Sequence, residues 1–252
     1  GQSNMVMPLN GFDYCPISDS NNVIADAPNH PGIRMVTIKP TVKLSPQEYA
    51  EGSWQQPTTE NAPKFSAAAY HYALTLQRTL QIPIGVITCA WGGSRVEGWL
   101  PKEILQTYKD EDLTLIGSDK TPVYLQSMLM YNGILYPCHK YTIKGFIWYQ
   151  GESNVRSSRT YAERLATMVK HWRSIWEQGD LPFYYVETVP FACEYKEDGY
   201  IGALLREAQQ KALSLIPNSG MIGTNDLVET YEAPQVHPHN KKGIGERLAY
   251  MS

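Results

Sequence analysis

The chain has 252 residues, of which 42% are hydrophobic and 19% are charged, and its formal net charge is −3. This length is sufficient for one large α/β domain or two small ones with a substantial core. The weakly acidic balance provides no basic field for phosphate backbones, which argues against a nucleic-acid partner. No apolar run approaches the length of a membrane span, so no membrane partner is expected.

The first part of the chain is predicted to be irregular. Residues 6–60 are rich in Pro, Asn, Ser and Asp and show no sustained hydrophobic period, so we expect at most short strands there, such as 33–38. Loops of this length are uncommon unless they help to shape a site. Residues 101–120 and 190–202 are also expected to lie near the site and to influence the choice of substrate.

The rest of the chain alternates between two kinds of pattern. Helical periodicity is found over 64–81, 123–135, 204–215 and 241–250, and residues 101–120 begin in the same way before becoming polar. A further helix is predicted to begin with a capping box of Thr160 and Glu163, to bury Trp172 and Trp176, and to stop at Gly179. Apolar runs typical of buried strands occupy 84–90, 143–149, 182–189 and 221–223.

This alternation of strands and helices predicts a parallel sheet that is covered on both faces, an α/β fold. No internal repeat or linker divides the chain, and we therefore expect a single domain over residues 1–252. The chain begins inside a motif and without an initiator methionine. We accordingly expect an upstream segment that contributes a strand before Gly1, and a secreted or periplasmic location.

Cysteine spacing says little about chemistry. Cys15, Cys89, Cys138 and Cys193 are far apart and form no C-x-x-C pair, which argues against a zinc site. One or two disulfides and unpaired buried thiols are both compatible with this spacing, and the apolar run around Cys89 favours a buried thiol there.

Three polar segments follow directly after predicted strands. They are Trp91-Gly92-Gly93, Gln150-Gly151-Glu152, and the loop after 221–223 that leads to His237. Ligands of open parallel sheets bind beyond the carboxyl ends of the strands, so these segments are expected to meet at one site.

A fourth segment, Gly1-Gln2-Ser3-Asn4-Met5, supplies a hydroxyl in a sequence suited to a tight loop. We predict that Ser3 is a nucleophile in a G-x-S-x-M setting, which differs from the G-x-S-x-G elbow of α/β-hydrolases. The structural alternative for Ser3 is a simple turn serine.

Of the six histidines, His237 is the best candidate for the base. It lies between Val236 and Pro238 in a loop before the last helix, where it is constrained without being inside an element. The other histidines are expected to be structural or at the surface, and the H-x-H pair that His239 forms with His237 lacks the further ligands of a metal site. Those others are His30, His71, His139 and His171.

Donors for an oxyanion are also available. The N–H of Ser3, the N–H of Gly92 or Gly93, and the side-chain amide of Gln150 could together stabilise a tetrahedral intermediate. Glu152, with Asn4, is expected to support the site, and the alternative for Glu152 is a general acid of a glycosidase.

The partner of the second His237 nitrogen is left open by the sequence. Glu232, Asp226 and Glu229 are candidate acids, and a backbone carbonyl that holds the ring in a Ser–His dyad is the other option.

Four blocks, GQSNM, AWGGSRVEGW, GFIWYQGESN and VHPHNKKGIGERLA, occur in this order from Gly1 to Leu248. Together they resemble the SGNH-hydrolase superfamily, specifically its sialate O-acetylesterase-like branch, which includes acetyl-xylan esterases and related carbohydrate esterases. The resemblance implies a flavodoxin-like α/β/α sandwich and removal of O-acetyl groups from carbohydrates, either sialic acid or acetylated plant or host glycans. It implies no metal and no cofactor.

Carried over by position, the resemblance makes Ser3 the nucleophile and His237 the base, and Gln150 stands where the superfamily usually has Asn. The D-x-x-H arrangement of the superfamily is missing, because Pro234 and Gln235 occupy the places of the acid.

Three other functions are compatible with the residues alone. They are an SGNH esterase or lipase that acts on non-sugar esters, an inactive carbohydrate-binding domain, and a carboxylate-pair glycosidase that uses Glu152. The particular sugar and the oligomeric state are not indicated by the sequence.

Overall fold

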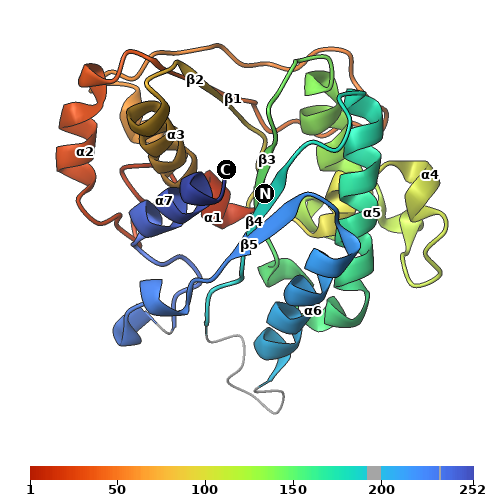
Figure 1. Cartoon of the computed structure of the whole chain (residues 1–252). Helices are drawn as coiled ribbons and strands as arrows, with labels where there is room; N and C mark the ends of the chain where they lie inside the picture. Colours follow the sequence, from red (N-terminus) through yellow and green to blue (C-terminus); the bar gives the residue numbers. More distant parts are fainter. Residues whose placement is uncertain (192–199, 233) are drawn as a thin grey trace.

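Parallel strands form the centre of the molecule in the computed structural model, which describes residues 1–191, 200–232 and 234–252 (Figure 1). All strand pairs in the described residues are parallel, with β1 beside β2 in one sheet and the order β3-β4-β5 in the other. The bounds are β1 Ile33–Thr37, β2 Ile84–Thr88, β3 Phe146–Tyr149, β4 Phe183–Val186 and β5 Ser219–Ile222. The prediction of a parallel sheet is confirmed. β1 to β4 are shorter than the predicted runs, whereas β5 begins two residues before the predicted run 221–223.

The start of the chain lies between the two sheets. The N–H of Trp91 donates to the carbonyl of Gly1 at 3.0 Å, and the amino group of Gly1 donates to the carbonyl of Cys89 at 3.0 Å. On the other side, the N–H of Gln2 donates to the carbonyl of Tyr149 at 3.0 Å. Residues 1 and 2 thereby connect the end of β2 to the end of β3.

Helices cover both faces of the strands, as Figure 1 shows, with α3 and α7 on one side and α5 and α6 on the other. The side chains of β3 alternate accordingly: Trp148 belongs to the core under α5 and α6, whereas Tyr149 belongs to the core under α3 and α7. The helices are α1 Ser3–Val6, α2 Ser20–Asp26, α3 Ala67–Leu80, α4 Lys102–Leu105, α5 Ser158–Trp176, α6 Ile201–Leu215 and α7 Lys241–Met251. The expected three-layer α/β/α arrangement is confirmed.

Helix α5 buries the predicted apolar stripe, including Trp172 and Trp176. Its predicted start is wrong, because the helix begins at Ser158 and the hydroxyl of Thr160 donates to the carbonyl of Ser157 instead of capping an N–H. A run of 3-10 turns over Glu152–Ser157 leads directly into α5 and supplies the start that the capping box was expected to provide.

The single helix expected over 123–135 is also wrong. A 3-10 turn covers Val123–Leu125, Met128 then has a φ of +72°, and a wider helical turn covers Tyr131–Leu135. The left-handed residue breaks the helical path, and buried side chains follow it, among them Leu129 and Met130. Tertiary packing therefore overrides the helical period of this segment.

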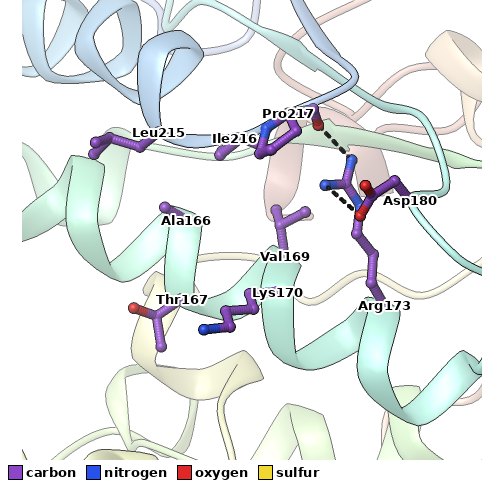
Figure 2. Close-up of a pocket in the computed structure, with 9 residues that line it drawn as sticks. All are labelled: Ala166, Thr167, Val169, Lys170, Arg173, Asp180, Leu215, Ile216 and Pro217. Atoms are coloured by element: carbon purple, nitrogen blue, oxygen red, sulfur yellow. Dashed lines mark hydrogen bonds and ion pairs between the residues drawn. The ribbon is translucent and has the colours of Figure 1, made fainter.

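The amino end of the sheet carries a separate hollow. This hollow has a volume of about 450 Å³. Figure 2 shows its lining between α5 and the chain after α6, with Arg173 reaching toward Pro217 and Asp180. Arg173 donates to the carbonyls of Leu181 and Pro217, both at 2.7 Å, just before β4 and β5 begin. The hollow is therefore at the opposite end of the strands from the segments predicted to form the site.

The cysteines within the described residues are free thiols. These are Cys15, Cys89 and Cys138, and the sulfurs of Cys89 and Cys138 lie 3.9 Å apart. Cys193 lies outside the described residues. Of the two predicted alternatives, disulfides and unpaired thiols, the second therefore holds at these three positions.

Within the described residues, no helix combines the length and the apolar character that crossing a membrane would require.

Candidate active site

Ser3 is the first residue of α1, a single helical turn directly after the link between β2 and β3. Its N–H lies at the start of this turn, where no intrahelical acceptor exists, and no other acceptor is bonded to it in the described part of the chain. The side chain of Gln2 holds the turn in place, because its Oε1 accepts from the N–H of Gly151 at 3.1 Å. The predicted loop is thus a short helix that begins at the nucleophile candidate.

The two glycines after β2 have different roles. A Cβ built on Gly92 would lie 3.7 Å from the Cβ of Ser3, which is ordinary van der Waals contact, so Gly92 lies directly against the nucleophile candidate. Gly93 has a φ of +74°, and a Cβ there would lie 2.6 Å from the ring of Tyr124. Among the described residues, nothing accepts a hydrogen bond from the N–H of Gly92. Gly92 is therefore the candidate oxyanion donor of the two, and Gly93 shapes the turn.

Gln150 does not provide the predicted third donor. Its Nε2 donates to the carbonyl of Ser94 at 3.1 Å and to Oδ1 of Asn154 at 2.7 Å, so both amide hydrogens are used, and the side chain is fully buried. The orientation is determined, because the same Oδ1 accepts from the N–H of Val96 and must therefore be an oxygen. Gln150 stabilises the floor of the candidate site, and the backbone N–H groups of Ser3 and Gly92 remain as candidate oxyanion donors.

His237 is buried, with 7% of its surface exposed, and neither ring nitrogen has a hydrogen-bond partner among the described residues. The rings of Phe12 and Tyr14 lie beside it, with centroids 5.2 Å and 6.1 Å from the imidazole. Burial, helped by the positive charge of Lys241, lowers the pKa of His237 to about 4. The ring is consequently neutral at physiological pH, the state that a general base requires.

The structure brings the Ser3 and His237 segments together. Asn4, the residue after Ser3, donates from Nδ2 to the carbonyl of Val236, the residue before His237, at 2.8 Å. The same Nδ2 donates to Oε1 of Glu152 at 2.6 Å. Three of the four segments predicted to form the site thus meet at one side-chain amide.

None of the three candidate acids contacts His237. Glu232 accepts from the N–H of His239 at 2.7 Å and pairs with Nδ1 of the same residue at 2.5 Å. Burial alone would raise the pKa of Glu232, but the hydrogen bonds from Glu229 and His239 outweigh it and lower the pKa. The carboxylate of Asp226 binds Arg247, and Glu229 is exposed at the surface.

The choice of Glu232 as the partner of His237 is therefore wrong, since this carboxylate belongs to His239. In the described residues, Ser3 and His237 form at most a dyad. The acid position of a D-x-x-H arrangement is occupied by Pro234, and Oε1 of the next residue, Gln235, lies 3.7 Å from the sulfur of Cys15.

This geometry agrees with a comparison of the whole sequence. Residues 1–251 match the family described as carbohydrate esterase, sialic acid-specific acetylesterase. The chain belongs to this family.

Relatives of this family member extend the comparison. The chain is 25% identical to proteins named sialate O-acetylesterase from Pongo abelii and Homo sapiens, over alignments that cover 98% of this chain and 50% of each relative. It thus spans about half the length of the curated relatives it matches. The structure of a carbohydrate acetylesterase from Xanthomonas citri matches with a TM-score of 0.86 at 31% identity, over 100% of this chain and 54% of that chain. A protein from Arabidopsis thaliana shares the fold, with a TM-score of 0.62 at 18% identity over 99% of this chain and 93% of its own.

Sequence reasoning missed the aromatic side chains of the candidate site and one buried lysine. Tyr14 and Tyr124 are 65% and 41% exposed beside His237 and Gly93, and nothing in the pattern distinguishes them from the other tyrosines. The position of Lys241 in the sequence was a signal that could have identified it. It is the first residue of α7, where the helix dipole disfavours a positive charge, so its position requires another explanation.

The contrast between the two glycines can be tested. Gly93→Ala forces a left-handed residue to carry a Cβ against the Tyr124 ring, and we expect it to lower the free energy of unfolding by about 1–3 kcal/mol. Gly92→Ala is the matched control, because its Cβ makes only ordinary contact, and its stability should change by less than about 0.5 kcal/mol. Urea unfolding of both variants measures the difference, and equal losses would contradict the roles given to the two glycines.

Proposed function

We propose that this chain is a serine esterase that removes O-acetyl groups from carbohydrates through an acetyl-serine intermediate. The observation that carries the proposal is the arrangement of Ser3. Its N–H is free at the start of a helical turn, Gly92 lies against its Cβ, and the next residue is hydrogen-bonded to the His237 segment at 2.8 Å. This arrangement supplies a nucleophile, two oxyanion donors and a neutral base.

The proposed reaction has two halves. The hydroxyl of Ser3 attacks the acetyl carbonyl and passes its proton to His237, while the N–H groups of Ser3 and Gly92 stabilise the tetrahedral anion. The intermediate collapses, and the sugar oxygen leaves with the proton from His237. Water then attacks the acetyl-serine by the same route and releases acetate. Catalytic hydrogen bonds are often unformed without substrate, so the unpaired ring of His237 is compatible with this role.

Two observations support a carbohydrate as the substrate. The relatives from Homo sapiens and Xanthomonas citri are named for acetylated sugars or carbohydrates. Exposed tyrosine rings also flank the site, Tyr14 beside His237 and Tyr124 against Gly93, and such rings stack well on sugar faces. An esterase of non-sugar esters would not need these two rings.

A glycosidase and an inactive binding domain fit the site less well. A glycosidase would use Glu152 as an acid, and burial does raise the pKa of this carboxyl. However, Glu152 is 8% exposed and its Oε1 is held by Asn4, so it is poorly placed to reach a glycosidic oxygen. A binding domain without activity would not require the free N–H groups around Ser3.

The central experiment measures acetate release from a panel of acetylated sialosides, xylans and other glycans. We expect Ser3→Ala and His237→Ala each to reduce kcat/KM by a factor on the order of 10⁴, with the double variant little worse, because such residues act as a unit. His239→Ala is the matched control, since it removes the neighbouring imidazole and should retain most activity. Strictly additive losses would contradict the proposal that Ser3 and His237 act as a unit. A loss of activity in His239→Ala but not in His237→Ala would indicate that His239, paired with Glu232, is the base.

The pH dependence follows from the burial of His237. Because its pKa is lowered to about 4, the neutral form that accepts the Ser3 proton persists down to about that pH. We therefore expect the acid limb of kcat/KM for 4-nitrophenyl acetate, which reports protonation of the base, to be centred near pH 4. An acid limb centred at the ordinary histidine pKa of about 6.5 would show that the base is another group or is solvated.

The aromatic rings offer a test of the sugar. Tyr14→Ala and Tyr124→Ala should each raise KM for an acetylated glycan by about 3- to 10-fold, through loss of stacking, while KM for 4-nitrophenyl acetate changes little. Tyr250→Ala is the control, because this tyrosine is 76% exposed near the C-terminal end of α7. Equal effects on both substrates would argue against a sugar platform.

A further inference from the structure

We propose that Asn4 and Lys241 form a clamp that sets the position of the base relative to the nucleophile. Lys241 is a positioning residue in this proposal: it acts through Asn4 and through the backbone on either side of His237, without touching the substrate. The inference rests on the proposed function, because it explains how the Ser3–His237 pair of that function is held in register.

The clamp holds the backbone on both sides of His237 by hydrogen bonds. Nδ2 of Asn4 donates to the carbonyl of Val236, before the histidine, at 2.8 Å. Nζ of Lys241 donates to the carbonyl of Pro238, after the histidine, at 2.7 Å. Nζ also donates to Oδ1 of Asn4 at 2.8 Å, and this third hydrogen bond connects the other two. Because Asn4 directly follows Ser3, one connected set of hydrogen bonds fixes both catalytic segments.

The orientation of the Asn4 amide is determined by charge. Its Oδ1 faces the ammonium of Lys241, and its Nδ2 faces the carboxylate of Glu152 at 2.6 Å. A flipped amide would place the NH₂ group against the ammonium and the oxygen against the carboxylate, which are both repulsive arrangements. Lys241 and Glu152 together therefore direct the second hydrogen of Nδ2 toward the carbonyl of Val236.

Lys241 is fully buried, so it cannot bind substrate in this conformation. Its ammonium makes the two hydrogen bonds and lies 5.7 Å from the centre of the Tyr149 ring. Burial lowers the pKa of Lys241 to about 7, although the charge of Glu152 opposes this shift. A buried charge of this kind is rarely a net gain in stability over an apolar side chain. Its presence at the start of α7, where the helix dipole disfavours it, is better explained by positioning.

The test compares Lys241→Met with Lys242→Met, a neighbouring lysine whose side chain is 59% exposed. For Lys241→Met we expect kcat for 4-nitrophenyl acetate to fall by about 10²-fold with KM nearly unchanged, since a misplacement of about 1 Å in a catalytic pair has such an effect. The second-order rate at which a fluorophosphonate labels Ser3 should fall by a similar factor. Lys242→Met should match the parent in both measurements.

Thermal melting shows whether the Lys241→Met variant is folded, so that a loss of catalytic rate can be distinguished from a loss of the folded state. Lys241→Met that is folded and retains the parent rates of labelling and hydrolysis would overturn the proposal, whatever its melting temperature. If Lys241→Met does not fold, Lys241→Gln, which keeps a shorter donor, is measured in the same way. Failure of both variants to fold would assign Lys241 to stability alone and would equally overturn the clamp.

The parent protein distinguishes failure of the clamp from failure of the proposed function. A parent that is neither labelled at Ser3 nor able to release acetate would refute the esterase. A parent that is labelled at Ser3, at a rate insensitive to Lys241→Met, would refute only the clamp.

Discussion

The hydrogen bonds of the Asn4 amide are the interaction on which the site depends. The parallel sheet brings the ends of β2 and β3 together, and residues 1 and 2 connect them, so Ser3 and Gly92 are placed by the backbone of the core. His237 lies in a long loop after β5, and no strand pairing involves the described residues of this loop. The amide of Asn4 holds that loop through a hydrogen bond to the carbonyl of Val236, a residue 232 positions away in the sequence. A hydrogen bond from the Cys15 sulfur to the carbonyl of His237 is a second restraint. The sheet therefore gives the approximate arrangement, and a few buried hydrogen bonds complete it.

The burial of Lys241 and Glu152 explains why their charges are joined through a polar side chain. An ammonium or a carboxylate without a partner is strongly disfavoured away from water, and the amide of Asn4 bridges the charges of Lys241 and Glu152. Burial also lowers the pKa of His237 to about 4. A base with a lowered pKa is present in its neutral form over a wide pH range, but it has a weaker intrinsic affinity for the Ser3 proton. The positive charge of Lys241 acts in the same direction.

Sequence patterns predicted the parts that depend on short-range periodicity. The strands that begin at Ile84 and Phe146, the buried stripe of α5 and the placement of the polar segments at the ends of strands follow from local spacing. The family resemblance gave Gln150 a role by its position alone. The amide hydrogens of Gln150 donate to Ser94 and Asn154, and no spacing in the sequence reveals these hydrogen bonds. The pairing of Glu232 with His239 depends on how one loop folds on itself, and the break at Met128 depends on packing against the core. These features are tertiary, and single-sequence reasoning has no access to them.

No acid lies beside His237 in the part of the chain that the structure describes. In the proposed reaction, two separate features of the structure therefore do the work that one carboxylate usually performs. In a Ser–His–Asp triad, the carboxylate orients the imidazole and stabilises the imidazolium. Here the orientation of the loop is supplied by bonds to the carbonyls of Val236 and Pro238, and the ring itself is packed against Phe12 and Tyr14. In the proposed reaction the imidazolium receives no comparable stabilisation from the described residues, so stabilisation of the transition state would depend more heavily on the N–H groups of Ser3 and Gly92. An oxyanion site on rigid backbone at the ends of β2 and β3 suits this distribution, because preorganised donors need no rearrangement as charge develops.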